Sequence, residues 1–530
     1  MKKLITLLLV LAMVLSLCPA MAEEPVVLTV AVADKTNVED YNTNEMTLYI
    51  EKALNVDLQF NVYASVDYNN KINLMVTSGD KLEDIILGSF ADSLVFTWAQ
   101  QGAIAPLTEY FKSAETAPNL FEAMERTGVD FRGSITLPDS EIYYVPTFNQ
   151  SYGNEYNKIW YYNAWMQKLG AEVPETLDDF ADLLRLAVET DLNENGLADE
   201  IGLAGWDGIN GFWFSYLMNA FTYYDTWNDH MKVVDGVVSF SYTEDAFRQG
   251  VEYIAAMIEE GLIAPESVTQ DQTSWKNMLN TAPNTVFAHT YTTSSQILDN
   301  AIKSDCLYIL PVEGPDGHRT AQYQPSKPGC GMVISATCEN IDAAFAVGDL
   351  LVCEYLGITT RWGQEGRDWD YVANTADPSQ YEGAYDVFGA YIIVYDDATF
   401  WSSGGLQNRS WMQNGPYIRQ YGIAGGRSAL VGKVSVYEKN IANADTAYQT
   451  CGYQPEEYII KLIYSAEEQE IVNKVSPDLK TFVEETVAGW LLDPASLTDE
   501  AWDAFLAGVE ELGASAWLEV AQAAYDRSRG

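Results

Sequence analysis

Apolar positions along the chain alternate between strand-like and helix-like spacing. β-Branched and apolar runs over residues 26–32, 56–63 and 85–87 predict three strands. Helix-like spacing fills the stretches between them, at residues 44–54 and 67–78. Strands that alternate with helices in this way are typical of βα units, so we expect an α/β fold with a largely parallel sheet.

The clearest helical pattern begins after Thr176. The Thr176 side chain can cap the third amide of a helix while Asp179 reaches back to the Thr176 amide, which is a capping-box arrangement. One face of that helix then carries Leu177, Phe180, Ala181, Leu184 and Val188. A similar pattern near the end of the chain consists of Thr498 followed by Trp502, Phe505, Leu506 and Val509. We expect both helices to pack their apolar faces against a core.

Length and composition indicate a folded protein of more than one lobe. A chain of 530 residues exceeds what one hydrophobic core usually organises, so two or more lobes are expected. The formal net charge of −46 repels nucleic acid and anionic lipid head groups, which proteins bind through lysine and arginine. Hydrophobic residues make up 48% of the chain and aromatic residues 12%, which excludes a disordered acidic protein.

The N-terminus has the features of a signal peptide. Two lysines precede an apolar run over residues 4–17, and the Ala-Met-Ala sequence at 20–22 has the small-x-small pattern of a cleavage site. We therefore expect residues 1–22 to be removed and the mature protein to be exported. Lipid attachment at Cys18 is the alternative, but that modification needs a small residue before the cysteine and Leu17 is large. No lipid anchor is expected.

Residues 191–200 combine oxygen-bearing side chains with a glycine, Gly196, at the sixth position. Glycine adopts the left-handed backbone that a sharp turn needs, and Ca²⁺ takes about six to eight oxygen ligands. The expected ligands are the side chains of Asp191, Asn193, Asn195, Asp199 and Glu200 and the carbonyl of Leu197. An EF-hand would carry a glutamate at position 12, where this chain has Gly202. We expect a structural calcium site of modified spacing; the alternative is a polar loop with chance spacing.

Cysteine and histidine give no sign of zinc chemistry. The cysteines after the predicted cleavage site are Cys306, Cys330, Cys338, Cys353 and Cys451, and none shows CxxC spacing. An odd number of cysteines cannot all pair within the chain. The three histidines, His230, His289 and His318, are scattered. This pattern argues against a zinc hydrolase and, more weakly, against Ser-His-Asp chemistry.

Short motifs follow one another in an order that resembles a known family. They are Ser78-Gly79-Asp80 with Asp84-Ile85, residues 102–108, 142–146, 162–176, 191–200, 314–317 and 363–366, and Tyr525-Asp526-Arg527. In this order they resemble the extracellular solute-binding proteins of family 1, especially the large calcium-containing members that bind oligosaccharides for ABC importers. The resemblance covers essentially the whole mature chain. Glu83 departs from it, since the family often has proline there, and so does the poor lipid-attachment motif.

The resemblance implies a two-lobed α/β fold of the periplasmic-binding-protein type (type II), with the ligand held between the lobes. Hinge crossings are expected near residues 146–151, 288–293 and 335–343. Lobe 1 would comprise residues 23–148 and 290–338, and lobe 2 residues 149–289 and 339–530. Lobe 2 would then contain the calcium loop and the C-terminal helices.

Candidate ligand-binding residues follow from the chemistry of sugars. A sugar ring presents an apolar C–H face, which aromatic rings cover, and a rim of hydroxyl groups, which polar side chains pair. Aromatic and charged candidates in glycine-rich or polar segments are Trp206, Trp213, Trp275, Trp362, Arg367 and Trp369. Core packing is the alternative for each tryptophan. In lobe 1, Asp34 and Ser89 follow predicted strands, whose carboxyl ends face the ligand in an open α/β sheet.

The expected function is capture of a neutral oligosaccharide by an exported monomer that delivers it to ABC permease subunits. The acidic chain disfavours anionic sugars. A secreted glycoside hydrolase is one alternative, because that chemistry needs only two carboxylates about 5–10 Å apart and the chain has 76 aspartates and glutamates. A non-catalytic cell-surface glycan-binding protein is the other. No local motif nominates a catalytic pair, and no enzymatic activity is expected.

Overall fold

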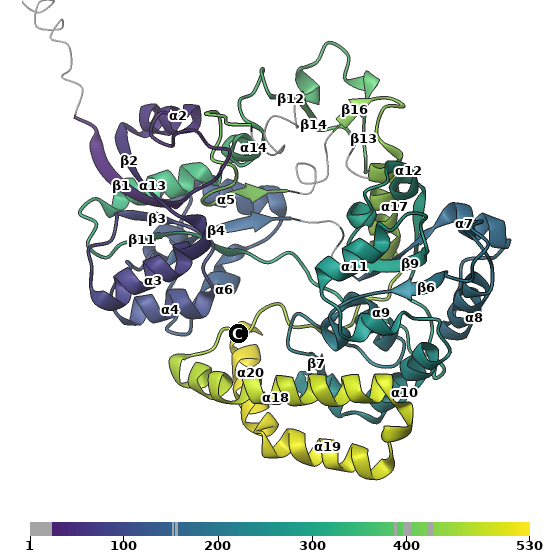
Figure 1. Ribbon diagram of the computed structural model, residues 1–530. Helices are drawn as coiled ribbons and strands as arrows, with labels where there is room; N and C mark the ends of the chain where they lie inside the picture. The colour runs from purple at the N-terminus through teal and green to yellow at the C-terminus, as the bar shows by residue number, and fades with distance from the viewer. Residues whose placement is uncertain are drawn as a thin grey trace, which may run out of the picture.

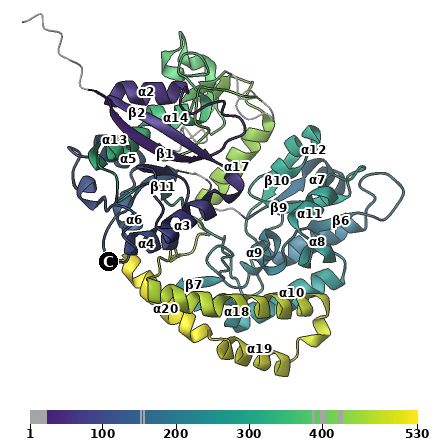
Figure 2. The ribbon, with the colours of Figure 1, turned by 60° about the vertical axis from the view of Figure 1, so that its left-hand side comes forward.

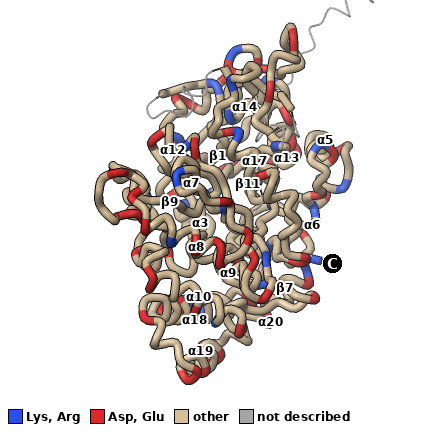
Figure 3. Tube along the Cα trace, turned by 90° about the vertical axis from the view of Figure 1, so that its right-hand side faces the viewer, with Lys and Arg blue, Asp and Glu red and all other residues tan. Residues whose placement is uncertain are grey.

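The computed structural model describes residues 24–150, 153, 157–385, 389–395, 405–420 and 428–529. They form two α/β lobes side by side, with a layer of C-terminal helices below the second lobe (Figure 1). The predicted signal peptide over residues 1–22 and Cys18 lie outside the described residues. Acidic residues are spread over both lobes rather than gathered on one face (Figure 3).

Lobe 1 is built on a six-stranded sheet with the order β15-β4-β11-β3-β1-β2. Its strands are β1 (Val26–Ala33), β2 (Val56–Tyr63), β3 (Ile85–Leu87), β4 (Tyr144–Asn149), β11 (Gly329–Ile334) and β15 (Ile418–Arg419). β1 runs parallel to β2 and β3, whereas β11 is antiparallel to both of its neighbours, β3 and β4. The sheet is therefore mixed rather than largely parallel, because its central strand β11 enters from lobe 2.

Helices from several parts of the described chain pack on this sheet or extend from it. They are α2 (Glu45–Leu54), α3 (Tyr68–Ser78), α4 (Asp92–Gln100), α5 (Pro118–Thr127), α6 (Phe131–Ile135), α13 (Ile341–Leu351) and α14 (Glu354–Trp362). The helices predicted at 44–54 and 67–78 are confirmed as α2 and α3. Beyond α14, two small sheets pair β12 (Trp369–Tyr371) with β14 (Ile392–Val394) and β13 (Tyr381–Gly383) with β16 (Ser428–Leu430).

Lobe 2 has a four-stranded sheet with the order β10-β5-β9-β6. Its strands are β5 (Lys158–Tyr162), β6 (Ile201–Ala204), β9 (Val286–Tyr291) and β10 (Cys306–Ile309), and a separate hairpin joins β7 (Met231–Val234) to β8 (Val237–Phe240). Its helices are α7 (Asn163–Leu169), α8 (Leu177–Val188), α9 (Phe212–Met218), α10 (Asp245–Glu259), α11 (Gln272–Leu279), α12 (Asn300–Asp305) and α17 (Val436–Thr450). The predicted capping box of α8 is confirmed: Thr176 accepts from the Asp179 amide at 3.1 Å, and Asp179 accepts from the Thr176 amide at 3.2 Å.

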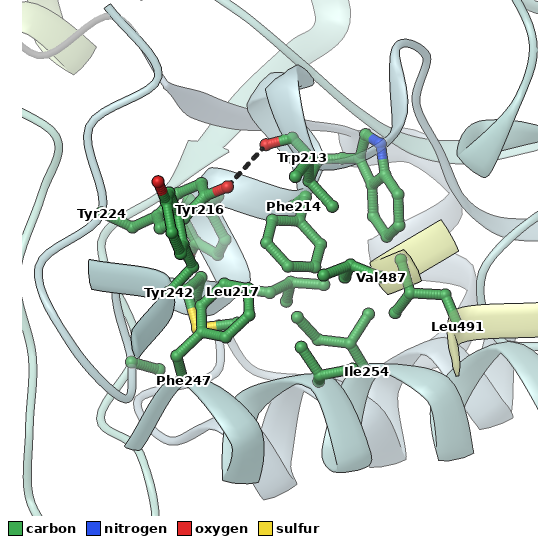
Figure 4. Packing of buried hydrophobic residues seen from close by; sticks show 14 of the residues in the cluster. Trp213, Phe214, Tyr216, Leu217, Tyr224, Tyr242, Phe247, Ile254, Val487 and Leu491 are labelled. Carbon is green, nitrogen blue, oxygen red and sulfur yellow. Dashed lines mark hydrogen bonds between the residues drawn. The ribbon is translucent and has the colours of Figure 1, made fainter. Parts of the chain in front are cut away.

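Three C-terminal helices complete the core of lobe 2. They are α18 (Ala466–Leu492), α19 (Asp499–Glu511) and α20 (Ala514–Arg529). Val487 and Leu491 of α18 pack beside Trp213 of α9 and Ile254 of α10 (Figure 4). The helix predicted after Thr498 is confirmed as α19, whose Trp502 and Phe505 are buried. None of the described helices combines the length and the apolar character needed to span a membrane.

Two of the predicted hinge crossings are wrong. The predicted return to lobe 1 at residues 288–293 fails because β9 and β10 belong to the lobe 2 sheet, so lobe 2 extends to Ile309 instead of 289. The crossing predicted at 335–343 fails because Phe345 and Leu351 of α13 pack in the lobe 1 core. The chain instead passes from lobe 1 to lobe 2 between β4 and β5, returns over residues 310–328, and changes lobe again between β15 and α17.

The segment that leads into α18 contacts lobe 1 before it enters lobe 2. Ile463 packs against the lobe 1 core. Lys461 forms an ion pair with Asp92 at the start of α4, and its Nζ lies 3.3 Å from the hydroxyl of Tyr144. Tyr144 in turn donates to Asp92 at 2.8 Å. These three polar groups hold the segment against lobe 1.

Two buried histidines make the stability of the fold sensitive to acid. Burial lowers the pKa of His289 to about 3, and burial with the nearby Lys480 charge lowers the pKa of His230 to about 3. Unfolded histidine titrates near pH 6.5. Below that pH the unfolded chain therefore binds more protons, and each histidine lowers the free energy of unfolding by up to about 1.4 kcal/mol per pH unit. Burial raises the pKa of Asp225 to about 6, which opposes this trend between pH 6 and 4.

We therefore expect the free energy of unfolding to fall by about 1 kcal/mol per unit as the pH drops from 6 to 4, since two histidines outweigh one aspartate. Urea titrations at several pH values measure this slope. In His289→Gln one titrating group is removed, and the slope is expected to become much shallower. An identical slope in that variant would show that other groups govern the acid response.

Candidate functional site

A polar cavity lies where the parallel strands of lobe 1 end. It has a volume of about 480 Å³ and follows the carboxyl ends of β1, β2 and β3. These three strands run parallel to one another, and β1 and β2 lie side by side in Figure 2. Its polar lining consists of Lys35, Ser65, Asn69, Asn70, Ser89, Thr147, Gln413 and Asn414, with the rings of Tyr68 and Tyr417. Ligands of open α/β sheets bind at strand carboxyl ends. The hydroxyl and amide groups here can both donate and accept hydrogen bonds.

A distant loop closes one side of this cavity. Asn414 donates to the carbonyl of Ala33 and to the hydroxyl of Tyr41, both at 2.8 Å, which fixes the loop to the end of β1. Met412 and Gln413 have φ values of 51° and 62°, a left-handed backbone that non-glycine residues adopt only when the surroundings impose it. The loop is therefore held in a defined shape beside the strand ends.

The opposite sheet carries aromatic rings at its own strand ends. β6 and β9 run parallel, and their carboxyl ends lead to Trp206 and Tyr291. The Trp206 ring centroid lies 4.2 Å from that of Trp275, 5.6 Å from Phe212 and 5.8 Å from Tyr291. Trp275 is fully buried beneath the others, whereas Phe212 and Tyr291 are partly exposed. We call Trp206, Phe212, Trp275 and Tyr291 the aromatic cluster; α11, which carries Trp275, lies on the side of lobe 2 nearer lobe 1 (Figure 1).

The predicted residues of lobe 1 lie at this cavity or beside it. Ser89 lines it. Asp34 is exposed between two lining residues, Ala33 and Lys35, and its amide donates to the Tyr63 carbonyl at 2.7 Å. Trp206 is 9% exposed within the aromatic cluster. These three residues are therefore placed where a ligand between the lobes could reach them or their immediate neighbours.

The other predicted tryptophans are core residues in this structure. Trp213 is buried among residues of α10 and α18 (Figure 4), and Trp275 donates to the carbonyl of Ala204 at 3.2 Å. Trp362 and Trp369 pack in a small core beyond α14, with exposures of 2% and 0%. The prediction that these four tryptophans contact the ligand directly is wrong, because protein encloses their rings and leaves no open face. Glycine-rich flanks did not distinguish a buried ring from an exposed one.

Arg367 also has a structural role. Its guanidinium pairs with Glu45 of α2 at 2.8 Å and with the buried Asp368 at 3.2 Å. These hydrogen bonds to Glu45, followed by those to Asp368, raise the pKa of Arg367. Both ion pairs join the turn before β12 to the first residue of α2, and Arg367 does not line the lobe 1 cavity. A ligand contact of Arg367 stays a prediction.

The calcium loop joins the end of α8 to β6. The Asp191 carboxylate accepts from the amides of Asn195 at 3.1 Å and Gly196 at 2.9 Å, and Asn195 donates to Asp199 at 3.0 Å. Gly196 has a φ of 79°, as the predicted turn requires. In the part of the chain that the structure describes, no three His, Cys, Asp or Glu side chains are grouped as a metal site.

One carboxylate oxygen of this loop, on Glu200, nevertheless has surroundings that suit a cation ligand. Glu200 is 8% exposed, and its Oε1 accepts from the amides of Leu192 at 2.7 Å and Asn193 at 3.1 Å. Its Oε2 is buried without a hydrogen-bond partner among the described residues. A buried carboxylate oxygen without a partner is costly. The donor set of carboxylate, amide and carbonyl oxygens matches the preference of calcium.

Sequence reasoning missed Phe212 and Tyr291 of the aromatic cluster and the 412–415 loop. Tyr291 is the last residue of β9, so the strand-end rule applied to Asp34 would have found it. The loop gave no comparable signal, because its contact with Ala33 joins residues far apart in the sequence.

The family model for bacterial extracellular solute-binding proteins matches residues 36–352, more than half of the chain. The chain belongs to the bacterial extracellular solute-binding proteins. This solute-binding protein is 25% identical over 513 residues to the fructooligosaccharide ABC transporter substrate-binding protein FusA of Streptococcus pneumoniae, covering 92% of this chain and 88% of FusA.

Two solved structures share the fold of this solute-binding protein. One is a human milk oligosaccharide (HMO) binding, ABC-transporter-associated protein from Bifidobacterium longum infantis, with a TM-score of 0.77, 18% identity, and coverage of 95% of this chain and 99% of that one. The other is the S. pneumoniae FusA EF-hand mutant in complex with fructo-nystose, with a TM-score of 0.69, 21% identity, and coverage of 95% and 99%. At these identities the likeness establishes the two-lobed fold.

Proposed function

We propose that this solute-binding protein captures a neutral oligosaccharide between its lobes and delivers it to the permease subunits of an ABC importer. The observation that carries the proposal is the pairing of a polar cavity at the strand ends of lobe 1 with an aromatic cluster at the strand ends of lobe 2. Aromatic rings cover the C–H face of a sugar, and hydroxyl and amide groups pair its rim. FusA, which is similar over most of its length, is a fructooligosaccharide-binding protein.

The described lining of the lobe 1 cavity offers neither a cationic patch for an anionic sugar nor a pair of carboxylates for hydrolysis. Among the described residues that line it, Lys35 is the one charged side chain, and no carboxylate is present. Glycoside hydrolysis needs two carboxylates that flank the scissile bond. One lysine in a chain of charge −46 offers little attraction to a polyuronate.

Incubation with a panel of neutral oligosaccharides tests both parts of this function. Some members are expected to raise the melting temperature, because a ligand that binds the folded state stabilises it. Chromatography of the same mixtures is expected to recover every sugar intact. Release of reducing ends above the rate in buffer would instead establish a hydrolase, and no stabilisation by any sugar would contradict carbohydrate binding.

Calcium binding in the loop at residues 191–200 is the second part of the proposal. The side chains of Asp191, Asn193, Asn195, Asp199 and Glu200 and the carbonyl of Leu197 would hold the ion. A bound cation would offset the three carboxylates among these ligands and tie the end of α8 to β6. The FusA EF-hand mutant is a structural relative whose name refers to such a loop. The role is structural, since the loop lies between the end of α8 and the start of β6. The ligand is expected at the carboxyl end of β6, which is the opposite end of that strand.

Removing calcium is therefore expected to lower the melting temperature without abolishing sugar binding. A ligand present at about a hundred times its dissociation constant contributes roughly 2.7 kcal/mol to stability. Asp191→Ala is expected to reproduce the effect of chelation. Glu194→Ala is the matched control, because the Glu194 side chain pairs with Lys168 at 3.0 Å instead of joining the predicted ligands. An unchanged melt after elemental analysis has confirmed metal removal would contradict the calcium site.

Export completes the proposed function. The signal-peptide pattern at residues 1–22 and the extracellular family support export of the mature chain. The net charge of −46 disfavours nucleic acid as a partner.

A further inference from the structure

A second cavity in lobe 2 borders the aromatic cluster. It has a volume of about 420 Å³ and is lined by residues that follow β6, by the loop before β7 and by α18. The lining residues are Asp207, Asn210, Phe212, Thr226, Trp227, Asp229, His230, Lys480 and Glu484. Phe212 belongs to both features, because its ring lies 5.6 Å from Trp206 and 6.0 Å from Tyr291. The cavity therefore adjoins the aromatic cluster at Phe212.

The backbone around this cavity is strained. Asp207, Asp229 and His230 have φ values of 66°, 55° and 60°, and all three line the cavity. A left-handed backbone at a non-glycine residue costs about 1–3 kcal/mol and persists at sites where the surroundings impose it, often binding sites. Aspartate and histidine are among the non-glycine residues that adopt this backbone most often. Three positive-φ residues therefore shape this surface.

His230 presents an unused polar atom there. The residue is 6% exposed, and its ring stacks on Tyr224 with the centroids 4.7 Å apart. Its Nε2 is buried and has no hydrogen-bond partner among the described residues. Burial and the charge of Lys480 keep the pKa of His230 at about 3, so the ring is neutral at physiological pH. A neutral imidazole nitrogen can pair with one hydroxyl group.

The remaining lining combines an aromatic face with hydrogen-bond acceptors. Trp227 is 50% exposed. Glu484 accepts from Asn210 at 2.8 Å, and Lys480 is paired with Asp229, so its charge is already compensated. Partial burial, followed by the charge of Glu484, raises the pKa of Asp207. The excess of carboxylates favours groups that donate hydrogen bonds and repels anions.

We infer that this cavity is a second sugar subsite, which holds a further unit of an oligosaccharide whose other units lie against the aromatic cluster. The ring of that unit stacks on Trp227, and its hydroxyls pair with Glu484, Asp207 and His230. The subsite makes binding depend on ligand length and selects neutral units over uronates. This inference rests on the proposed function, since it concerns the same ligand.

The position of the cavity places this end of the ligand beside a hinge. Thr226 exchanges hydrogen bonds with Gln322 of the 310–328 crossing, at 3.2 Å and 3.4 Å, and Gln322 donates to Asp225 at 2.9 Å. A unit seated on Trp227 therefore lies next to the segment about which two lobes rotate.

Calorimetric titration with two neutral ladders, fructo-oligosaccharides and malto-oligosaccharides of about two to eight units, tests the subsite. For the ladder that binds, affinity is expected to rise at the chain length that first fills the subsite. Trp227→Ala is expected to lower the affinity of members of that length or longer by roughly five- to hundredfold. Shorter members are expected to bind both proteins equally. Trp227→Phe is the matched control, because it retains a stacking ring. Glu484→Gln is expected to weaken the long members alone and to admit oligouronates better.

Several outcomes would overturn the inference while leaving the proposed function intact. One is equal affinity of Trp227→Ala and the natural protein at every length. Another is an equal loss for short and long members, which would make this cavity the primary site instead of an added one. If neither ladder nor any other neutral oligosaccharide binds the natural protein, the proposed function itself fails.

Discussion

Replacing Tyr291 by alanine is expected to weaken oligosaccharide binding by about 1–3 kcal/mol, or roughly 5- to 150-fold, the range measured for stacking of ring ligands on aromatic side chains. Tyr291 ends β9 and is partly exposed, so its ring is available to a ligand. Its ring also packs against Trp206 and Trp275, with ring centroids 5.8 Å and 5.9 Å apart. These contacts fix the orientation of the Tyr291 ring before the ligand binds. Calorimetry with the best sugar from the panel measures the loss.

Two further variants separate stacking from other effects. Tyr291→Phe keeps the ring and is expected to retain most of the affinity. Tyr49 is a tyrosine that is 43% exposed but lies on α2 of lobe 1, and Tyr49→Ala is expected to bind normally. If Tyr291→Ala also bound normally, the aromatic cluster would be part of the core and not a sugar surface.

Lys461→Met is expected to lower the free energy of unfolding by about 3 kcal/mol, because it leaves Asp92 mostly buried without its cation. The side chains of Lys461 and Asp92 are 16% and 12% exposed, and Tyr144 already donates to Asp92. One hydroxyl cannot replace an ammonium group at this position. Chemical denaturation followed by fluorescence measures the change.

The double variant Lys461→Met/Asp92→Asn distinguishes the ion pair from packing. Removing both charges is expected to restore part of the stability, since the cost arises from the unpaired carboxylate. Lys112→Met supplies a surface comparison, because Lys112 and Glu109 are 60% and 82% exposed and such pairs contribute at most about 1 kcal/mol. Equal losses in Lys461→Met and Lys112→Met would show that the contact with lobe 1 is not structurally important.

Local patterns in the sequence were sufficient for single elements. Thr176 and Asp179 are three residues apart, so their capping box needs no information from the rest of the chain. The alternation of strands and helices likewise indicated the α/β class. The order of the short motifs then indicated the family, because these motifs are distributed along the whole chain.

Assignment of strands to sheets required contacts that no local pattern contains. β9 and β10 have ordinary strand composition, and only their pairing with β5 places them in lobe 2. Burial of tryptophan is similar: Trp275 is enclosed because Trp206, from a segment about 70 residues earlier in the chain, lies over it. The loop around Asn414 reaches Ala33 by the same kind of long-range contact.

The assembly of lobe 2 from distant parts of the chain sets the order in which the protein can fold. Its core joins Ile159, near the first crossing, to Trp517 and Tyr525, near the C-terminus. The apolar faces of α9 and α10 stay uncovered until α18 and α20 have been made. The lobe 1 sheet is also completed late, because its central strand β11 comes after most of lobe 2 in the sequence. A chain that emerges from N to C therefore cannot complete either core until most of its length has been made.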